Sequence, residues 1–278
     1  MMLVDFAGGL TDSALMSTDD ARSAWNRCRH DPARTAGHYE SYFQRGNHPS
    51  RKLAFWIRYT LFSPKGRPRD AVGELWAIYF DGERRRITPV KVVVPYSRCL
   101  FNAWELNARI GDAVLDGSSL RGSAEVLDHS LAWDLRYTSA EEPLFLLPEG
   151  LYDASFPKAK ALVGAPLARF SGSLVVDGEA IPVDDWVGSQ NHNWGVKHTD
   201  EYAWGQVAGF DEAPGSFLEV STARVHLGPI KTPWLSPMVL RHEGREYRWI
   251  AIRTAIRAKA HYDFFRWTFD TRADGARL

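Results

Sequence analysis

Short runs of aromatic and β-branched residues with a period of two recur along this chain and constrain its fold most strongly. The clearest covers residues 53–62 and ends at the turn signal Ser63-Pro64-Lys65-Gly66. No helical pattern of about 10–15 residues lies between the runs, so the sequence predicts an antiparallel all-β fold and disfavours a parallel α/β fold. The other runs occupy residues 72–80, 87–94, 120–126, 129–137, 144–147, 167–176, 181–183, 202–210, 217–225, 238–241, 247–252 and 262–269.

The arrangement of the runs suggests two β modules preceded by a short helix. Thr18-Asp19-Asp20 is a plausible cap for a helix over residues 21–28. Residues 148–166 interrupt the strand pattern, and 278 residues exceed the usual one-domain length of about 100–200. Closed barrels remove the exposed edges of long apolar strands. We therefore expect two consecutive antiparallel β-barrels, with module boundaries 1–155 and 156–278.

Charge and cysteine content exclude several classes of function. Lysine plus arginine number 34 and aspartate plus glutamate number 34, so no excess positive charge exists to attract nucleic acid. Cys28 and Cys99 lack metal-ligand spacing, and residues 1–5 lack the regions of a signal peptide, which predicts a cytoplasmic protein. No apolar run reaches the roughly 18 residues of a membrane span, so no integral membrane segment is expected.

Cofactor motifs are also missing from the sequence. There is no P-loop, no dinucleotide fingerprint after a strand and no Gly-x-Ser-x-Gly elbow. His192, His198 and His226 lack the short spacing of a zinc motif. We therefore expect neither a metal nor an organic cofactor. Aromatic residues make up 13% of the chain and include 11 tryptophans, which suits a cavity for a hydrophobic ligand as well as the core of a large barrel.

Residues 185–207 hold the densest group of polar and aromatic side chains. On an extended backbone, Gln190, His192 and Trp194 share one face, and Asn191 and Asn193 share the other. We expect the first face to meet a second one across a turn, which would place a few polar groups in an aromatic wall, as in most small-molecule sites. That second face carries Tyr202, Trp204 and Gln206.

These residues resemble a known superfamily. His192-Asn193-Trp194-Gly195 followed by Tyr202-Ala203-Trp204-Gly205-Gln206 is similar to the signature of the lipocalin-like superfamily of hydroxyneurosporene synthase, tocopherol cyclase and AttH-like proteins. Residues 54–64 and 73–77 resemble its N-terminal module. The resemblance implies two lipocalin-like barrels and cofactor-free acid chemistry on a carbon–carbon double bond of a terpenoid or polyketide-like hydrophobe. Gln190-Asn191 depart from the pattern, since the hydratases and cyclases carry a charged residue there.

The leading functional hypothesis is a hydratase, cyclase or isomerase that acts on such a molecule in a barrel cavity. Histidine can donate a proton near neutral pH, and aromatic faces stabilise a cation by about 0.5–2 kcal/mol each. His192 is the candidate acid or base, with Asp200, Tyr202 or Glu219 to orient it. Candidate substrate-binding residues are Gln190, Trp194, Trp204, Gln206, Trp76 and Glu74.

Three other interpretations stay open at this point. A histidine on an inward strand face is more often a hydrogen-bonded structural residue, and His192 fits that role too. The same cavity without chemistry would make the chain a carrier for a lipophilic ligand. Alternatively, the paired barrels form a scaffold whose core is filled by its own side chains.

Overall fold

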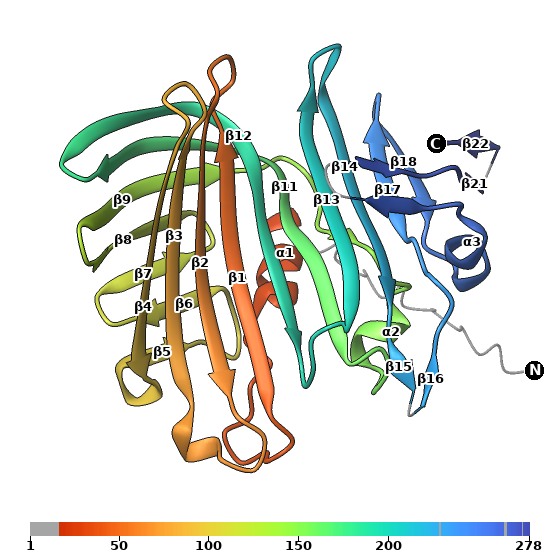
Figure 1. The fold of residues 1–278 in the computed structure, drawn as a ribbon, viewed down its shortest axis with the longest axis horizontal. Helices are drawn as coiled ribbons and strands as arrows, with labels where there is room; N and C mark the ends of the chain where they lie inside the picture. Colours follow the sequence, from red (N-terminus) through yellow and green to blue (C-terminus); the bar gives the residue numbers. More distant parts are fainter. Residues whose placement is uncertain (1–16, 228, 264–265, 274) are drawn as a thin grey trace, which may run out of the picture.

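Antiparallel strands dominate the structure, a computed structural model that describes residues 17–227, 229–263, 266–273 and 275–278 (Figure 1). The all-β class is confirmed. The predicted short helix is confirmed as α1 (Thr18–Asn26), whose N-cap is Ser17, one residue before the expected cap. The Ser17 hydroxyl accepts from the backbone N–H of Asp20 at 3.2 Å. The other helices are short: α2 (Gly150–Asp153), α3 (Ile252–Arg257) and the 3₁₀ turns η1 (Pro68–Asp70) and η2 (Tyr96–Arg98).

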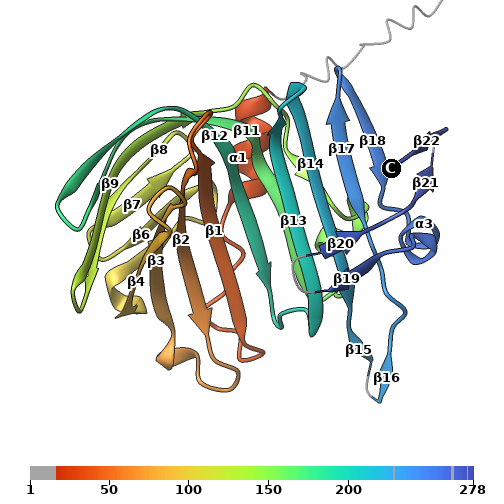
Figure 2. The ribbon, with the colours of Figure 1, turned by 45° about the horizontal axis from the view of Figure 1, so that its top comes forward.

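The first 12 strands form one large sheet. Along the main path its order is β4-β3-β2-β1-β12-β11-β9-β8-β7-β6-β5, with β10 paired to β11. The sheet curls into a nearly closed barrel (Figures 1 and 2). Its strands are β1 (His38–Asn47), β2 (Leu53–Ser63), β3 (Val72–Asp81), β4 (Arg86–Pro95), β5 (Cys99–Phe101), β6 (Asn107–Ile110), β7 (Ala113–Asp116), β8 (Ser119–Val126), β9 (His129–Thr138), β10 (Leu144–Phe145), β11 (Ala159–Val176) and β12 (Glu179–Gly195).

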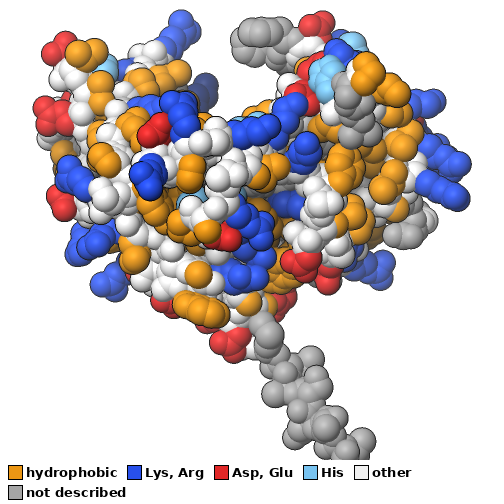
Figure 3. Space-filling model, turned by 90° about the horizontal axis from the view of Figure 1, so that it is seen from below, with side chains coloured by type: hydrophobic (Ala, Val, Ile, Leu, Met, Phe, Trp, Pro, Cys, Tyr) orange, Lys and Arg blue, Asp and Glu red, His pale blue; other side chains and the backbone are white. Residues whose placement is uncertain are grey.

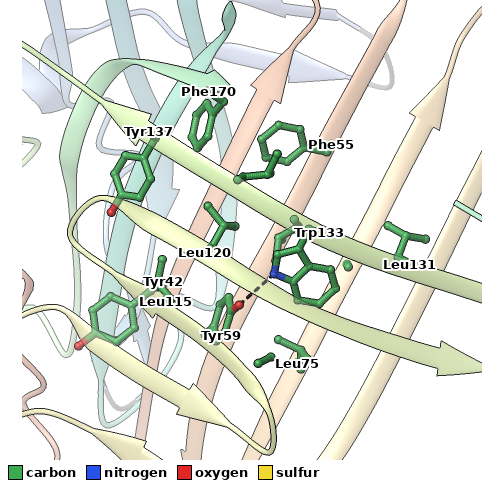
Figure 4. Close-up of a cluster of buried hydrophobic side chains, with 14 of the residues drawn as sticks. Tyr42, Phe55, Tyr59, Leu75, Leu115, Leu120, Leu131, Trp133, Tyr137 and Phe170 are labelled. Atoms are coloured by element: carbon green, nitrogen blue, oxygen red, sulfur yellow. Dashed lines mark hydrogen bonds between the residues drawn. The ribbon is translucent and has the colours of Figure 1, made fainter. Parts of the chain in front are cut away.

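Side chains fill the interior of this barrel. Tyr59, Trp133 and Phe170 are at most 2% exposed and converge with leucines from opposite walls (Figure 4). The indole N–H of Trp133 donates to the Tyr59 hydroxyl at 3.1 Å, and that hydroxyl donates to the carbonyl of Val114 at 2.9 Å. The polar ends of these large rings are thus satisfied inside the core, as burial requires.

Strands β1 and β12 lie side by side near the middle of the sheet. Their register pairs Tyr42 with His192 and Gln44 with Gln190. Because side chains alternate between the two faces of a strand, these four residues point to the barrel side, and Phe43 and Arg45 point outward. The sequence predictions did not include β1, although it supplies side chains to both faces.

A second sheet packs against the outer face of the first one. It contains β13 (Glu201–Phe210), β14 (Ala213–Arg224), β17 (Met238–His242) and β18 (Arg245–Trp249). One face carries Phe217 and Val239, which pack with Val163 of β11. The other face packs against α3 and the C-terminal ladders. The C-terminal ladders are β19 (His261–Asp263) with β20 (Arg266–Thr268), and β21 (Arg272–Ala273) with β22 (Ala276–Arg277). A further two-stranded ladder, β15 (His226–Leu227) with β16 (Ile230–Lys231), follows β14.

The two sheets divide the chain between β12 and β13, at residues 195–201. Residues 159–195 therefore belong to the large sheet. The predicted division into modules 1–155 and 156–278 stays a prediction. In the described part of the chain, no helix combines the length and apolar character needed to cross a bilayer.

Candidate functional site

His192 lies on the barrel side of β12, fully buried beneath α1. Its Nε2 is 2.8 Å from Glu40 Oε1, and its Nδ1 is 3.2 Å from the backbone carbonyl of Trp25. The ring stacks on Tyr42 with centroids 4.3 Å apart. Trp194, on the same strand face, lies 4.5 Å from the imidazole, and Gln190 exchanges hydrogen bonds with Asn26. The predicted alternation of Gln190, His192 and Trp194 therefore matches the register.

Glu40 is the centre of this cluster. Besides His192, its carboxylate accepts from the backbone N–H of Arg29 at 2.9 Å, from His38 Nε2 at 2.8 Å and from the Tyr42 hydroxyl at 3.1 Å. Burial alone would raise the pKa of Glu40, but the hydrogen bonds from His192 and His38 outweigh burial and hold that pKa below its ordinary value. Burial lowers the pKa of His192, although Glu40 opposes the shift.

The expected meeting of the His192 face with the Tyr202, Trp204 and Gln206 face does not occur. Those three residues lie on the second sheet, which packs on the opposite side of β12. Asp200 is in the turn before β13, where it pairs with Lys197 at 2.5 Å and accepts from the backbone N–H of His226. Asp200 and Tyr202 thus stand apart from His192, and Tyr202 is 57% exposed.

Glu219 occupies a second polar cluster, between the two sheets. Its Oε1 accepts from the Trp204 indole at 2.7 Å, and its Oε2 accepts from the Gln206 amide at 2.6 Å. The Gln206 carbonyl oxygen in turn accepts from Ser189 of β12 at 2.6 Å and from Arg45 of β1. The structure therefore brings together three of the predicted site residues, Trp204, Gln206 and Glu219. The group at the centre of the cluster is the Glu219 carboxyl and not the His192 imidazole.

The environment of Glu219 changes its acidity. The residue is 2% exposed, and burial raises its pKa to about 7, although the hydrogen bonds from Trp204 and Gln206 act in the opposite direction. Burial also lowers the pKa of Arg45 to about 10. A carboxyl group with a pKa near 7 holds its proton for part of the time at neutral pH, which is the property of a general acid or base.

A row of aromatic rings leads from this carboxyl group to an open hollow. Phe43 lies 5.8 Å from Trp204 on one side and 5.9 Å from Trp56 on the other. Trp56 lines a hollow of about 360 Å³ on the outer face of β1, β2 and β3. Seen from below, the molecule is hollowed between its two halves (Figure 3). The complete lining is Arg45, Asn47, Ala54, Phe55, Trp56, Ile78 and Phe80.

The last two predicted residues, Glu74 and Trp76, lie on the same outer face of β3. Their register places Trp76 opposite Arg58 of β2. Glu74 accepts from the Trp76 indole at 3.3 Å and from Lys91 at 3.0 Å. They therefore extend the outer face that carries the hollow, although they do not line the hollow itself.

The sequence predictions missed Glu40, Phe43 and Arg45, all on β1. A signal for that strand exists, because Tyr39, Tyr42 and Phe43 favour a strand and Gly46-Asn47 favours a turn. In the described residues no group of three or more histidine, cysteine, aspartate and glutamate side chains is placed to hold a metal ion.

Comparison with known sequences finds one pair of curated relatives. No family model matches the chain. An uncharacterized protein of Mycobacterium tuberculosis, found in strains CDC 1551 and H37Rv, is 28% identical over 193 residues, which are 69% of this chain and 54% of the mycobacterial protein. The chain thus spans about half the length of the curated relatives it matches.

Two solved structures are similar in architecture. A Nitrosomonas europaea protein assigned as AttH aligns with a TM-score of 0.60 and 14% identity, over 91% of this chain and 77% of that protein. CghA in complex with Sch210972 aligns with a TM-score of 0.43 and 12% identity, over 76% of this chain and 59% of CghA. The strand content, the nearly closed barrel and the first of these structures together show that this chain has the lipocalin-like fold of AttH-like proteins.

Proposed function

We propose that this chain binds a hydrophobic small molecule in the hollow on the outer face of β1, β2 and β3 and converts it by cofactor-independent acid chemistry of the hydratase, cyclase or isomerase kind. The observation that carries the proposal is the position of Glu219. A buried, protonatable carboxyl group lies beside the partly exposed Trp204 indole, at the end of an aromatic row that begins in the hollow. Apolar lining with few polar groups is the usual composition of a ligand site.

The chemistry requires one proton to move in each direction. The protonated Glu219 carboxyl transfers its proton to one carbon of an alkene, the π electrons form the new C–H bond, and a carbocation forms at the neighbouring carbon. Water, an internal nucleophile or loss of an adjacent proton then quenches the cation, and the released proton returns to the Glu219 carboxylate. The faces of Trp204, Phe43 and Trp56 stabilise the positive charge by about 0.5–2 kcal/mol each where they contact it.

His192 is the other candidate acid, and geometry favours Glu219. Both ring nitrogens of His192 are already engaged, by Glu40 and by the Trp25 carbonyl, and the ring is buried on the opposite face from the hollow. In this proposal His192 and Glu40 hold β1, β12 and α1 together, which fixes the outward positions of Phe43 and Arg45.

The test is conversion of a bound compound. The protein is incubated with a lipid extract and repurified, and the bound compounds are identified by mass spectrometry. The intact protein should return a product absent from the extract, Glu219→Gln should return the unaltered precursor, and the control Glu83→Gln, on an exposed turn, should behave like the intact protein. Conversion by Glu219→Gln at the intact rate would remove Glu219 from the mechanism.

A carrier function is the second candidate. It is favoured by the fact that both carboxyl oxygens of Glu219 already accept hydrogen bonds from the protein. A carrier would return the same unaltered compound from the intact protein and from Glu219→Gln.

A further inference from the structure

Two arginine side chains on the outer face of the large sheet carry buried donors without partners, although Nε of Arg45 donates to Gln206. Arg45 Nη2 and Arg58 Nε are buried and make no hydrogen bond. Neither guanidinium group forms an ion pair with a carboxylate in the part of the chain that the structure describes. The neighbouring cation Lys91 differs, because it pairs with Glu74 at 3.0 Å.

Both arginines lie on the outer face that carries the hollow, and Arg58 lies beside the lining residue Trp56 without lining the hollow itself. Arg45 lines the hollow and is paired in register with Trp56 of β2. Arg58 is paired with Phe43 on one side and with Trp76 on the other, and its guanidinium carbon lies 5.9 Å from the Trp56 ring centroid. Arg45 and Arg58 are thus diagonal neighbours on adjacent strands, about 7–8 Å apart at that position of a sheet. Two side chains of this length can reach one anion from there.

Glu219 and Glu74 lie within electrostatic range of Arg45 and Arg58, respectively, but neither carboxylate forms an ion pair with its arginine. Burying a guanidinium group without a hydrogen-bonded counter-charge is unfavourable. A sheet face that serves only for packing gains nothing from two such groups, whereas a binding site gains a pair of donors for an anion. The fork geometry of arginine matches a carboxylate particularly well.

We propose that the ligand of this hollow is amphipathic, with an apolar body on Trp56, Ile78 and Phe80 and one carboxylate group that Arg45 and Arg58 bind. This inference rests on the proposed function, since it names the chemical class of molecule that the same hollow takes. It excludes purely hydrocarbon ligands as the preferred ones.

Dodecanoic acid and methyl dodecanoate are the matched probes, because they share one apolar chain and differ in charge. Binding is followed by tryptophan fluorescence at pH 8 and low probe concentration. The intact protein should bind the acid more tightly than the ester by about tenfold or more, the usual contribution of a charge-assisted hydrogen bond. Arg58→Gln should lose this preference while keeping its affinity for the ester, Arg58→Lys should keep part of it, and the exposed control Arg69→Gln should keep all of it.

The outcomes separate the two proposals. Equal affinity of the intact protein for acid and ester would overturn the carboxylate assignment and leave the hydrophobic site standing, and this comparison needs no variant to fold. Absence of binding for both probes would instead contradict the proposed function. Full preference for the acid in Arg58→Gln would overturn the role of Arg58.

Discussion

The protonation of Glu219 makes the stability of this protein depend on pH in a direction unusual for a carboxyl group. The pKa of Glu219 is about 7 in the folded chain, against an ordinary value of 4.5. Between these two values the folded state binds more protons than the unfolded state, so the free energy of unfolding falls as the pH rises. Each pH unit of that interval is worth about 1.4 kcal/mol, and the full effect is about 3 kcal/mol between pH 4.5 and pH 7.

Urea denaturation of the intact protein and of Glu219→Gln, at pH 5 and at pH 8, measures this effect. Other titrating groups contribute equally to both proteins and cancel in the difference. Relative to the glutamine variant, the intact protein should lose about 2.5 kcal/mol of stability from pH 5 to pH 8, since pH 5 already lies above the unfolded pKa. The exposed control Glu83→Gln should show no such change. A difference between the intact protein and Glu219→Gln that stays constant with pH would refute the raised pKa.

Three further predictions concern the Glu40 cluster, the contact between β1 and β12, and the hollow. Glu40→Gln should destabilise the protein by about 3–5 kcal/mol in urea, since several buried donors lose their charged acceptor, whereas the exposed Glu179→Gln should change little. Gly188→Ala should cost about 3 kcal/mol because its Cβ would lie 1.8 Å from the Arg45 carbonyl oxygen, and Gly150→Ala, with open space around its Cβ, should unfold at nearly the same urea concentration as the intact protein. Ala54→Phe should weaken dodecanoic acid binding by about tenfold in calorimetry, because the ring would occupy part of the hollow of about 360 Å³; unchanged affinity would place the ligand elsewhere.

The sequence predicts most of the large sheet because its strands alternate clearly. Strands β2 and β3 bury every second residue, and the observed bounds Leu53–Ser63 and Val72–Asp81 lie within one residue of the predicted ones. Strand β1 is different, since nearly all of its residues are buried and polar side chains occupy both faces. A strand buried on two sides by two sheets loses the contrast on which pattern reading depends.

The candidate site is predictable only in part. Periodicity places His192 and Gln190 on one face of β12 correctly, yet it contains no information about what that face meets. Glu219 illustrates the same limit, because both faces of β14 are buried: Leu218 and Val220 pack against the C-terminal elements, and Glu219 faces the first sheet. Only tertiary pairing decides that the tryptophan and glutamine of β13 surround a carboxyl group.

The pairing of β1 with β12 has a consequence for synthesis of the chain. Tyr42 and His192 are register partners 150 positions apart, and β1 has no second neighbour until β12 is available. On the ribosome, the first four strands therefore emerge long before their sheet can be completed, and they expose an unpaired edge during elongation. Nascent chains that stop before residue 195 should accordingly depend on chaperones and be cleaved readily by proteases.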